Sequence, residues 1–335
     1  MHDYLIKLKS AMQSQGCPPN YINDCTKYAS KLLNKGLPVI FDREHFSRLI
    51  GFKLEELEEL LKKDNYRVVK IPKKDGHRDL YIPNPRLKLI QKWMLMNLIS
   101  KVKISKHARG FITDTSLVDN AIEHVNKDFV VSLDIRDFFP SINKYRVYRI
   151  FRSLGYCNDL AGIFTALLVT NNGLPQGAPT SPYLSHIVCK KLDSRISKEL
   201  KHFEGCSFTR YADDFSISGG NEILEKISNI IYIISSEGFE LNFSKTRIQS
   251  NSQKQLVTGL VVNEKVNVPS SYKRRLKQEI YYCKKYGVNS HMKRLGINKS
   301  NYKLYLYGKA YYIKMINQKL GEKFLSELNE IDWPY

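Results

Sequence analysis

Two adjacent carboxylates inside a strand-forming run constrain this chain more than any other feature. They lie in Tyr211-Ala212-Asp213-Asp214, between the segments Phe208-Thr209-Arg210 and Phe215-Ser216-Ile217. The pattern predicts a strand, a tight turn and a returning strand, with both acids at the hairpin tip. Because adjacent carboxylates repel each other, a fold seldom holds them together without a cation. The pair alone is also compatible with a solvated Asp-Asp turn.

A second acidic segment favours the metal site. Residues 129–135 read Phe-Val-Val-Ser-Leu-Asp-Ile, an apolar run that predicts a buried strand carrying Asp134. Beside the hairpin, this strand would bring three carboxylates around two hard cations. Between the two acidic segments, residues 174–182 read LPQGAPTSP, a loop of small residues that opens a helix near Tyr183. The order of acid strand, loop and hairpin is much more specific than any one of them.

Together these segments resemble the reverse transcriptases of the retron type, with polymerase elements from about Lys70 to Lys265. Asn120-Ala121-Ile122-Glu123-His124 matches the NAxxH element of that family. Val257, Thr258 and Gly259 match its VTG element, which the resemblance assigns to contacts with a cognate structured RNA. For Asn120 and His124, a structural pair on one helix face and an RNA contact both stay open.

The resemblance implies an α+β fold, a right-hand polymerase with fingers, a ferredoxin-like palm, a helical thumb and an N-terminal helical extension. Short β-type runs at 66–71 and 79–82 flank a basic turn with an Asp75-Gly76 hairpin signal. We expect a helix over 87–102, a helix near 222–237 and a last palm strand over 241–248. The expected domains are 1–65 (N-terminal helical extension), 66–128 (fingers), 129–142 (first catalytic strand of the palm), 143–172 (fingers helices), 173–264 (palm) and 265–335 (basic helical thumb that binds RNA).

The motif match implies a two-metal centre for nucleotidyl transfer. Asp134 and Asp213 would bridge two Mg²⁺ ions, with Mn²⁺ as a substitute, and Asp214 would support the ion on the primer side. The backbone carbonyl of Ile135 is a further candidate ligand. Asp137 lies past the strand, which favours a solvated or pairing role for it. Tyr211 would lie beneath the primer end.

Other residues are assigned to the nucleotide and the template. Phe139 falls where related enzymes place an aromatic gate against the ribose 2′-hydroxyl, which implies a DNA product, although a core phenylalanine is the alternative. Gln176 would contact the template or the nascent pair. Lys73 and Arg78 suit a grip on the incoming triphosphate. Lys245 resembles a later basic motif that assists departure of pyrophosphate.

The charge balance points to a polyanionic partner. The chain has 53 basic and 33 acidic residues, a net charge of +20. Residues 265–335 hold 15 basic and 5 acidic residues and 10 of the 21 tyrosines. Basic residues among aromatics suit RNA binding, and a helical bundle explains most of the tyrosines as core. The segment begins with Ser270 as a candidate helix N-cap, and its candidate RNA-binding residues are Lys273, Arg274, Arg275, Lys277, Lys284 and Lys285.

Six cysteines without a CxxC pair, and apolar runs too short for a bilayer, indicate a cytoplasmic protein with no membrane partner. The resemblance implies further partners: a cognate msr-msd noncoding RNA, dNTPs, an effector protein encoded nearby and a host ribonuclease H. It also implies DNA synthesis from an internal guanosine 2′-hydroxyl, which yields branched msDNA for antiphage defence. The alternatives are an intron-like or other defence-associated reverse transcriptase without 2′ priming, and a catalytically silent RNA-binding scaffold.

Overall fold

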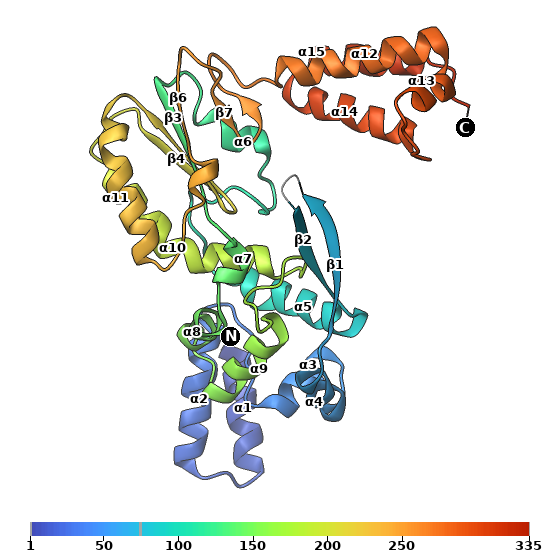
Figure 1. Cartoon of the computed structure of the whole chain (residues 1–335). Coiled ribbons are helices and arrows are strands. Elements are labelled where there is room, and N and C mark those ends of the chain that lie inside the picture. Colours follow the sequence, from blue (N-terminus) through green and yellow to red (C-terminus); the bar gives the residue numbers. More distant parts are fainter. Residues whose placement is uncertain (1, 74–75, 335) are drawn as a thin grey trace. The chain divides into compact units, whose positions relative to one another are not determined.

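A computed structural model describes residues 2–73 and 76–334 of the chain (Figure 1). The chain divides into two compact units, each assembled from three stretches. The first unit contains Met1–Thr113, Ile135–Glu199 and Ser228–Asn242. The second unit contains Asp114–Asp134, Leu200–Ile227 and Phe243–Tyr335.

The N-terminal part of the first unit is helical, as the sequence predicts. Helices α1 (His2–Ser14) and α2 (Pro19–Leu33) lie side by side (Figure 1). Helix α3 (Arg43–Ile50) is capped by Asp42, whose carboxylate accepts a hydrogen bond from the backbone N–H of His45. Helix α4 (Leu54–Lys62) buries leucines on one face and exposes glutamates on the other.

A β-hairpin follows these helices. Strands β1 (Tyr66–Lys73) and β2 (Gly76–Pro83) pair antiparallel, and their register brings Lys73 opposite Gly76. This confirms the predicted hairpin, with strands somewhat longer than expected. Lys74 and Asp75, where the turn signal falls, lie outside the described residues.

Short helices make up the rest of the first unit. The predicted helix over 87–102 is observed as α5 followed by a 3₁₀ turn, because Leu98 leaves the regular helix. The core contains aromatic rings in edge-to-face contact, among them Phe46, Phe151 and Phe164. The elements are α5 (Pro85–Asn97), η1 (Ile99–Lys101), α7 (Phe138–Ser141), α8 (Lys144–Leu154), α9 (Asn158–Leu168) and most of α10 (Ser181–Leu200).

A four-stranded antiparallel sheet lies in the second unit. Its strands are β3 (Phe129–Asp134), β4 (Ser207–Tyr211), β5 (Asp214–Gly219) and β6 (Arg247–Ser250), in the order β4-β5-β3-β6. With α10 before β4 and α11 (Glu222–Ser236) before β6, the order along the chain is the predicted ferredoxin-like one.

The last strand of the sheet differs from its predicted position. It was expected over 241–248, but β6 begins at Arg247. Phe243–Lys245 instead forms a 3₁₀ turn, η2, and Leu241 makes only a single bridge to Ile135. The physical reason for this difference is the ion pair that Lys245, at the end of the turn, forms with the carboxylate of Asp134.

A small hairpin packs on a short helix within the second unit. Strands β7 (Leu256–Val257) and β8 (Leu260–Val261) form the hairpin, and α6 (Leu117–Ile122) supplies Ala121 to their shared core. At the tip, Thr258 and Gly259 have φ of +47° and +85°. Positive φ at both turn positions suits a two-residue hairpin.

The chain ends in a helical bundle (Figure 1) of α12 (Ser270–Tyr286), α13 (Val288–Arg294), α14 (Tyr302–Ile316) and α15 (Gln318–Asn329). The N-cap of α12 is Pro269 rather than the predicted Ser270, which is the first helical residue. Tyr302 is buried in the bundle core, whereas Tyr281 and Tyr286 are exposed. In the described part of the chain no helix is long and apolar enough to cross a membrane. None of the six cysteines, all of them described, forms a disulfide.

Candidate active site

The two predicted acidic segments meet in the second unit. Strands β3 and β5 pair in a register that places Asp134 opposite Asp214. Strand β4 ends at Tyr211, which pairs with Asp214, so Ala212 and Asp213 form the turn between the strands. Since directly opposed residues of an antiparallel pair have neighbouring side chains, the register brings the acids together.

The turn that carries the acids is held by a residue that sequence reasoning missed. Ala212 has φ of +56°, in the left-handed region that is unfavourable for a residue with a Cβ. The fully buried guanidinium of Arg210 donates a hydrogen bond of 3.0 Å to the carbonyl of Ala212. The sequence does contain a signal for this role, because Arg210 is a charged residue within an apolar strand and lies close to two acids.

His124 fastens the hairpin from within the protein. One ring nitrogen lies 2.7 Å from the hydroxyl of Ser218 on β5, and the other lies 2.7 Å from the hydroxyl of Thr209 on β4. The ring is fully buried. His124 therefore bonds to both strands of the acidic hairpin. It lies just past the end of α6, which ends at Ile122, rather than on the helix as expected.

Asn120, the other end of the NAxxH element, is also buried. Its amide nitrogen lies 3.4 Å from the hydroxyl of Thr258, at the tip of the β7–β8 hairpin. The NAxxH and VTG elements, more than 130 positions apart in the sequence, thus contact each other within one unit. This contact gives both elements a structural role, and binding of RNA by either stays a prediction.

A lysine neutralises one of the acids. The ammonium of Lys245 lies 2.8 Å from both carboxylate oxygens of Asp134, whose side chain is 8% exposed. The pKa of Asp214 is raised from 3.8 to about 7, chiefly by burial and then by the negative charges of Asp213 and Asp134. The positive charge of Lys245 acts in the opposite direction and lowers this pKa. Asp134, Asp213 and Asp214 therefore carry more negative charge than Lys245 alone can neutralise.

A cavity of about 420 Å³ opens beside these side chains. Asp134, Asp214 and Lys245 line one part of it, and Thr258 and Gly259 of the small hairpin line another. Tyr211 also lines it. The cavity thus joins the carboxylates to the VTG turn inside the second unit.

The donor chemistry of this group fits a hard divalent cation. Among residues 2–73 and 76–334, no three side chains of Asp, Glu, His or Cys already converge as in a formed metal site. Asp134 and Asp214 are neighbours, however, and Lys245 supplies positive charge directly on Asp134. A raised carboxyl pKa is the expected sign of acids placed for a cation in its absence.

Two predicted nucleotide-contacting residues are linked in the first unit. The backbone N–H of Leu174 donates to the carbonyls of Phe139 and Ile142, each at 3.1 Å. The carbonyl of Gln176 accepts a hydrogen bond of 2.8 Å from the N–H of Tyr81 on β2. The LPQG loop is therefore fastened on one side to the helix of Phe139 and on the other to the β1–β2 hairpin.

Close backbone packing explains a glycine of this loop. Gly177 has φ of +121°, and a Cβ there would lie 2.8 Å from the carbonyl oxygen of Tyr81. Lys73 and Arg78 belong to the same hairpin, and both are exposed. Phe139 and the side chain of Gln176 are half-buried. The first unit thus holds four of the five predicted nucleotide-contacting residues on mutually bonded elements, and the fifth, Lys245, lies in the second unit.

The remaining predicted residues have varied surroundings. Asp137 is highly exposed and lies 4.0 Å from Arg136, in agreement with a solvated or pairing role. Ile135 is buried and bridges Leu241. On α12, Arg274 and Lys277 are exposed. The other basic residues of that helix have partners within the protein: Lys273 bonds to Asn267, Arg275 to Glu279, Lys284 to Glu330, and Lys285 lies over Tyr281 and Tyr286.

Comparison with known proteins identifies the family. Residues 71–297 match the family described as reverse transcriptase (RNA-dependent DNA polymerase). The chain is 33% identical over 273 residues to the retron Ec86 reverse transcriptase of Escherichia coli, covering 78% of this chain and 85% of that protein. This chain is a retron-type reverse transcriptase. It is also 30% identical over 341 residues to the retron Mx162 enzyme of Myxococcus xanthus, covering 89% of this chain and 68% of that one.

Among solved structures, a telomerase of Candida albicans in complex with a fragment of telomeric RNA aligns with this chain at a TM-score of 0.46 and 11% sequence identity. The alignment covers 94% of this chain and 60% of the telomerase chain. The family assignment rests on the sequence relatives. Membership makes the protein an RNA-directed DNA polymerase that uses an RNA template and dNTPs. The predicted right-hand polymerase fold is confirmed with it.

Proposed function

We propose that this reverse transcriptase copies a structured noncoding RNA encoded beside its gene and starts from an internal guanosine 2′-hydroxyl of that RNA. The product would be msDNA, a branched RNA–DNA molecule. The main support for a working polymerase site is the register of Asp134 with Asp214 beside Lys245. Support for the retron type of substrate comes from the NAxxH and VTG elements and from the retron relatives.

In this proposal Asp134, Asp213 and Asp214 hold two Mg²⁺ ions, or Mn²⁺ in their place, with the carbonyl of Ile135 as a further ligand. When bound, the ions lower the pKa of the attacking hydroxyl and offset charge on the reacting phosphate. The residues themselves keep the oxygen ligands at one sheet end, because the β3–β5 register and the Arg210 bond fix their backbones.

The first unit supplies the nucleotide contacts. Lys73 and Arg78 bind the triphosphate, Gln176 contacts the template or the nascent pair, and Phe139 excludes the ribose 2′-hydroxyl by collision. Support comes from the bonds that join the LPQG loop to both the helix of Phe139 and the β1–β2 hairpin. In the second unit Tyr211 lies under the primer end, and Lys245 leaves Asp134 to assist departure of pyrophosphate.

The RNA partner would be bound chiefly by the VTG turn, the NAxxH element and the basic α12 helix. Of the predicted RNA-binding residues in the two elements, Thr258 and Gly259 line the cavity beside the acids, whereas Asn120, His124 and Val257 are buried. On α12, Arg274 and Lys277 are free to meet phosphates as exposed cations. The complex would act in the cytoplasm in antiphage defence, with an effector protein encoded nearby and a host ribonuclease H that removes the template.

The test is synthesis by the purified full chain with the RNA encoded next to its gene, dNTPs and Mg²⁺. We expect a short DNA that stays joined to RNA until a debranching enzyme is added. The double variant Asp213→Ala, Asp214→Ala should make no DNA while it binds the RNA within several-fold of the wild type. DNA released without debranching would indicate a reverse transcriptase without 2′ priming, and RNA binding without any DNA would indicate a silent scaffold.

A further inference from the structure

A row of packed side chains leads from α8 to Phe139 within the first unit. The guanidinium carbon of Arg146 lies 4.5 Å from the centroid of the Phe239 ring. The Phe239 ring lies 6.0 Å from that of Phe138, which in turn lies 5.3 Å from that of Phe139. Phe138 and Phe239 are buried, and Phe139 is half-buried. One side of the Phe139 ring is therefore supported by a row of tilted aromatic rings that ends at a cation.

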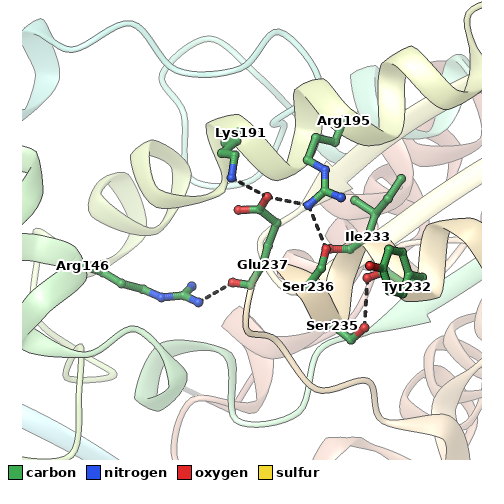
Figure 2. A network of polar contacts seen from close by, with 8 residues as sticks. All are labelled: Arg146, Lys191, Arg195, Tyr232, Ile233, Ser235, Ser236 and Glu237. Atoms are coloured by element: carbon green, nitrogen blue, oxygen red, sulfur yellow. Dashed lines mark hydrogen bonds and ion pairs between the residues drawn. The ribbon is translucent and has the colours of Figure 1, made fainter.

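Arg146 is held in place by the turn that follows α11. Its guanidinium donates a hydrogen bond to the backbone carbonyl of Glu237 (Figure 2). It donates another, of 3.3 Å, to the backbone carbonyl of Gly238. Gly238 has φ of +75°, and a Cβ at this position would collide with the guanidinium. The turn thus leaves room for Arg146 by having no side chain there.

The turn itself is anchored to α10. The carboxylate of Glu237 lies 2.9 Å from the ammonium of Lys191 and 2.7 Å from the guanidinium of Arg195 (Figure 2). Arg195 also donates to the hydroxyl of Ser236 at 2.8 Å. The Glu237 side chain is only 15% exposed. Charge-assisted bonds at a mostly buried carboxylate fix the turn more firmly than a surface ion pair does.

Residues 240–241, which follow the turn, also hold the backbone of residues 135–136, a few positions before Phe139. The backbone N–H of Arg136 donates a hydrogen bond of 2.8 Å to the carbonyl of Glu240. Ile135 and Leu241 form an antiparallel bridge. The segment over 237–241 therefore supports Phe139 in two ways, through the row of tilted rings and through the backbone.

We propose that Arg146 is a positioning residue for sugar selection, which holds the Phe139 ring where it collides with a 2′-hydroxyl. The inference rests on the proposed role of Phe139 as the gate. A collision discriminates only while the ring cannot retreat, and small displacements of a well-placed group change rates strongly. Without Arg146, the row of Phe239 and Phe138 rings loses the cation at its end, so Phe139 gains room to move away from a ribose.

The experiment measures kcat/KM for a dNTP and for the matching rNTP on a primed RNA template, with the full chain. Arg146→Ala should lower the preference for dNTP by roughly 10-fold, mainly by improving use of the rNTP, and Phe139→Val should lower it by roughly 100-fold. The double variant should select no worse than Phe139→Val alone, because the two residues act through one ring. Arg149→Ala, on the exposed face of the same helix, is the matched control and should keep the wild-type ratio.

A purely structural role for Arg146 predicts a different pattern. It would lower the efficiency with both nucleotides in parallel, leave the ratio unchanged and add to the effect of Phe139→Val, and this result would overturn the inference. If Phe139→Val itself keeps the wild-type ratio, Phe139 is not the gate, and the proposed role of Phe139 fails together with that of Arg146. Arg146→Lys provides a milder variant in case the alanine variant does not fold. It keeps the charge but loses the planar group over Phe239, so it should shift the ratio in the same direction by a smaller factor.

Discussion

Replacing Asp214 by asparagine should stabilise the protein in the absence of divalent cations. The pKa of Asp214 is about 7 in the folded protein against 3.8 ordinarily, so the folded state disfavours its charge. Below about pH 4 the group is protonated in both the folded and the unfolded state, and it costs no stability. As the pH rises the unfolded chain ionises first, so stability falls progressively and is lowest above about pH 7. Asparagine has the same shape and cannot ionise.

The size of this effect follows from the shift and from the exposure of the side chain. The full shift would correspond to about 4 kcal/mol of unfolding free energy. Asp214 is exposed in part, so water and salt screen the repulsion from its neighbours. We therefore expect a gain of about 1–2 kcal/mol for Asp214→Asn near pH 8, which raises the melting temperature by a few degrees.

The assay is thermal unfolding of wild type and variant from about pH 4 to pH 8, in EDTA and then with increasing Mg²⁺. The advantage of Asp214→Asn should disappear near pH 4. Added Mg²⁺ should stabilise the wild type more than the variant, because a ligand that binds only the folded state raises its stability. Asp137→Asn is the control, since Asp137 is a highly exposed acid outside the group. Equal melting of wild type and Asp214→Asn in EDTA at pH 8 would refute the charge conflict, and equal stabilisation by Mg²⁺ would refute the ligand role.

Three further predictions test other parts of the structure. Lys245→Met removes the ammonium from Asp134 and should tighten binding of Mn²⁺ by about 3- to 10-fold in an electron paramagnetic resonance titration without nucleotide; unchanged binding would contradict competition between lysine and metal. His124→Ala leaves two buried hydroxyls without their partner and should lower the free energy of unfolding by about 2–4 kcal/mol in urea denaturation, and a loss under 1 kcal/mol would be too small for such a clamp. Gly173→Ala places a Cβ against the backbone of Pro140 and should cost about 3 kcal/mol or more by the same measurement. Gly205→Ala, at a similar positive φ in open space, should cost only about 1 kcal/mol, and equal losses would show that strain alone acts.

The features that the sequence predicted correctly depend on local pattern. Alternation and turn residues predicted the hairpin at Asp213, and an apolar run ending in an acid predicted the β3 strand with Asp134. The resemblance to a family then predicted the order of the strands and helices of the palm along the chain. Each of these signals lies within a few neighbouring residues, so no tertiary contact was needed to read it.

The features that were missed depend on contacts between distant residues. Arg210 was read as part of an apolar strand, because nothing local shows that its guanidinium is buried and bonded to the next turn. The segment before β6 was predicted as strand, although the ion pair of Lys245 with Asp134 favours a 3₁₀ turn there. The row of rings from Arg146 to Phe139 includes Phe239, which is close to both in space and nearly 100 positions away in sequence. Such contacts override local preference, and a single sequence does not display them.

The charges of the acidic group explain why the fold tolerates it. With all three acids ionised, Asp134, Asp213 and Asp214 carry three negative charges, and Lys245 supplies one positive charge. Two negative charges remain, which a divalent cation would offset. Without that cation, the raised pKa of Asp214 means that a proton supplies part of the missing charge near neutral pH. Lysine, proton and metal are thus alternative sources of positive charge for the same oxygens, and at or below neutral pH the first two reduce the repulsion that the fold must tolerate without metal.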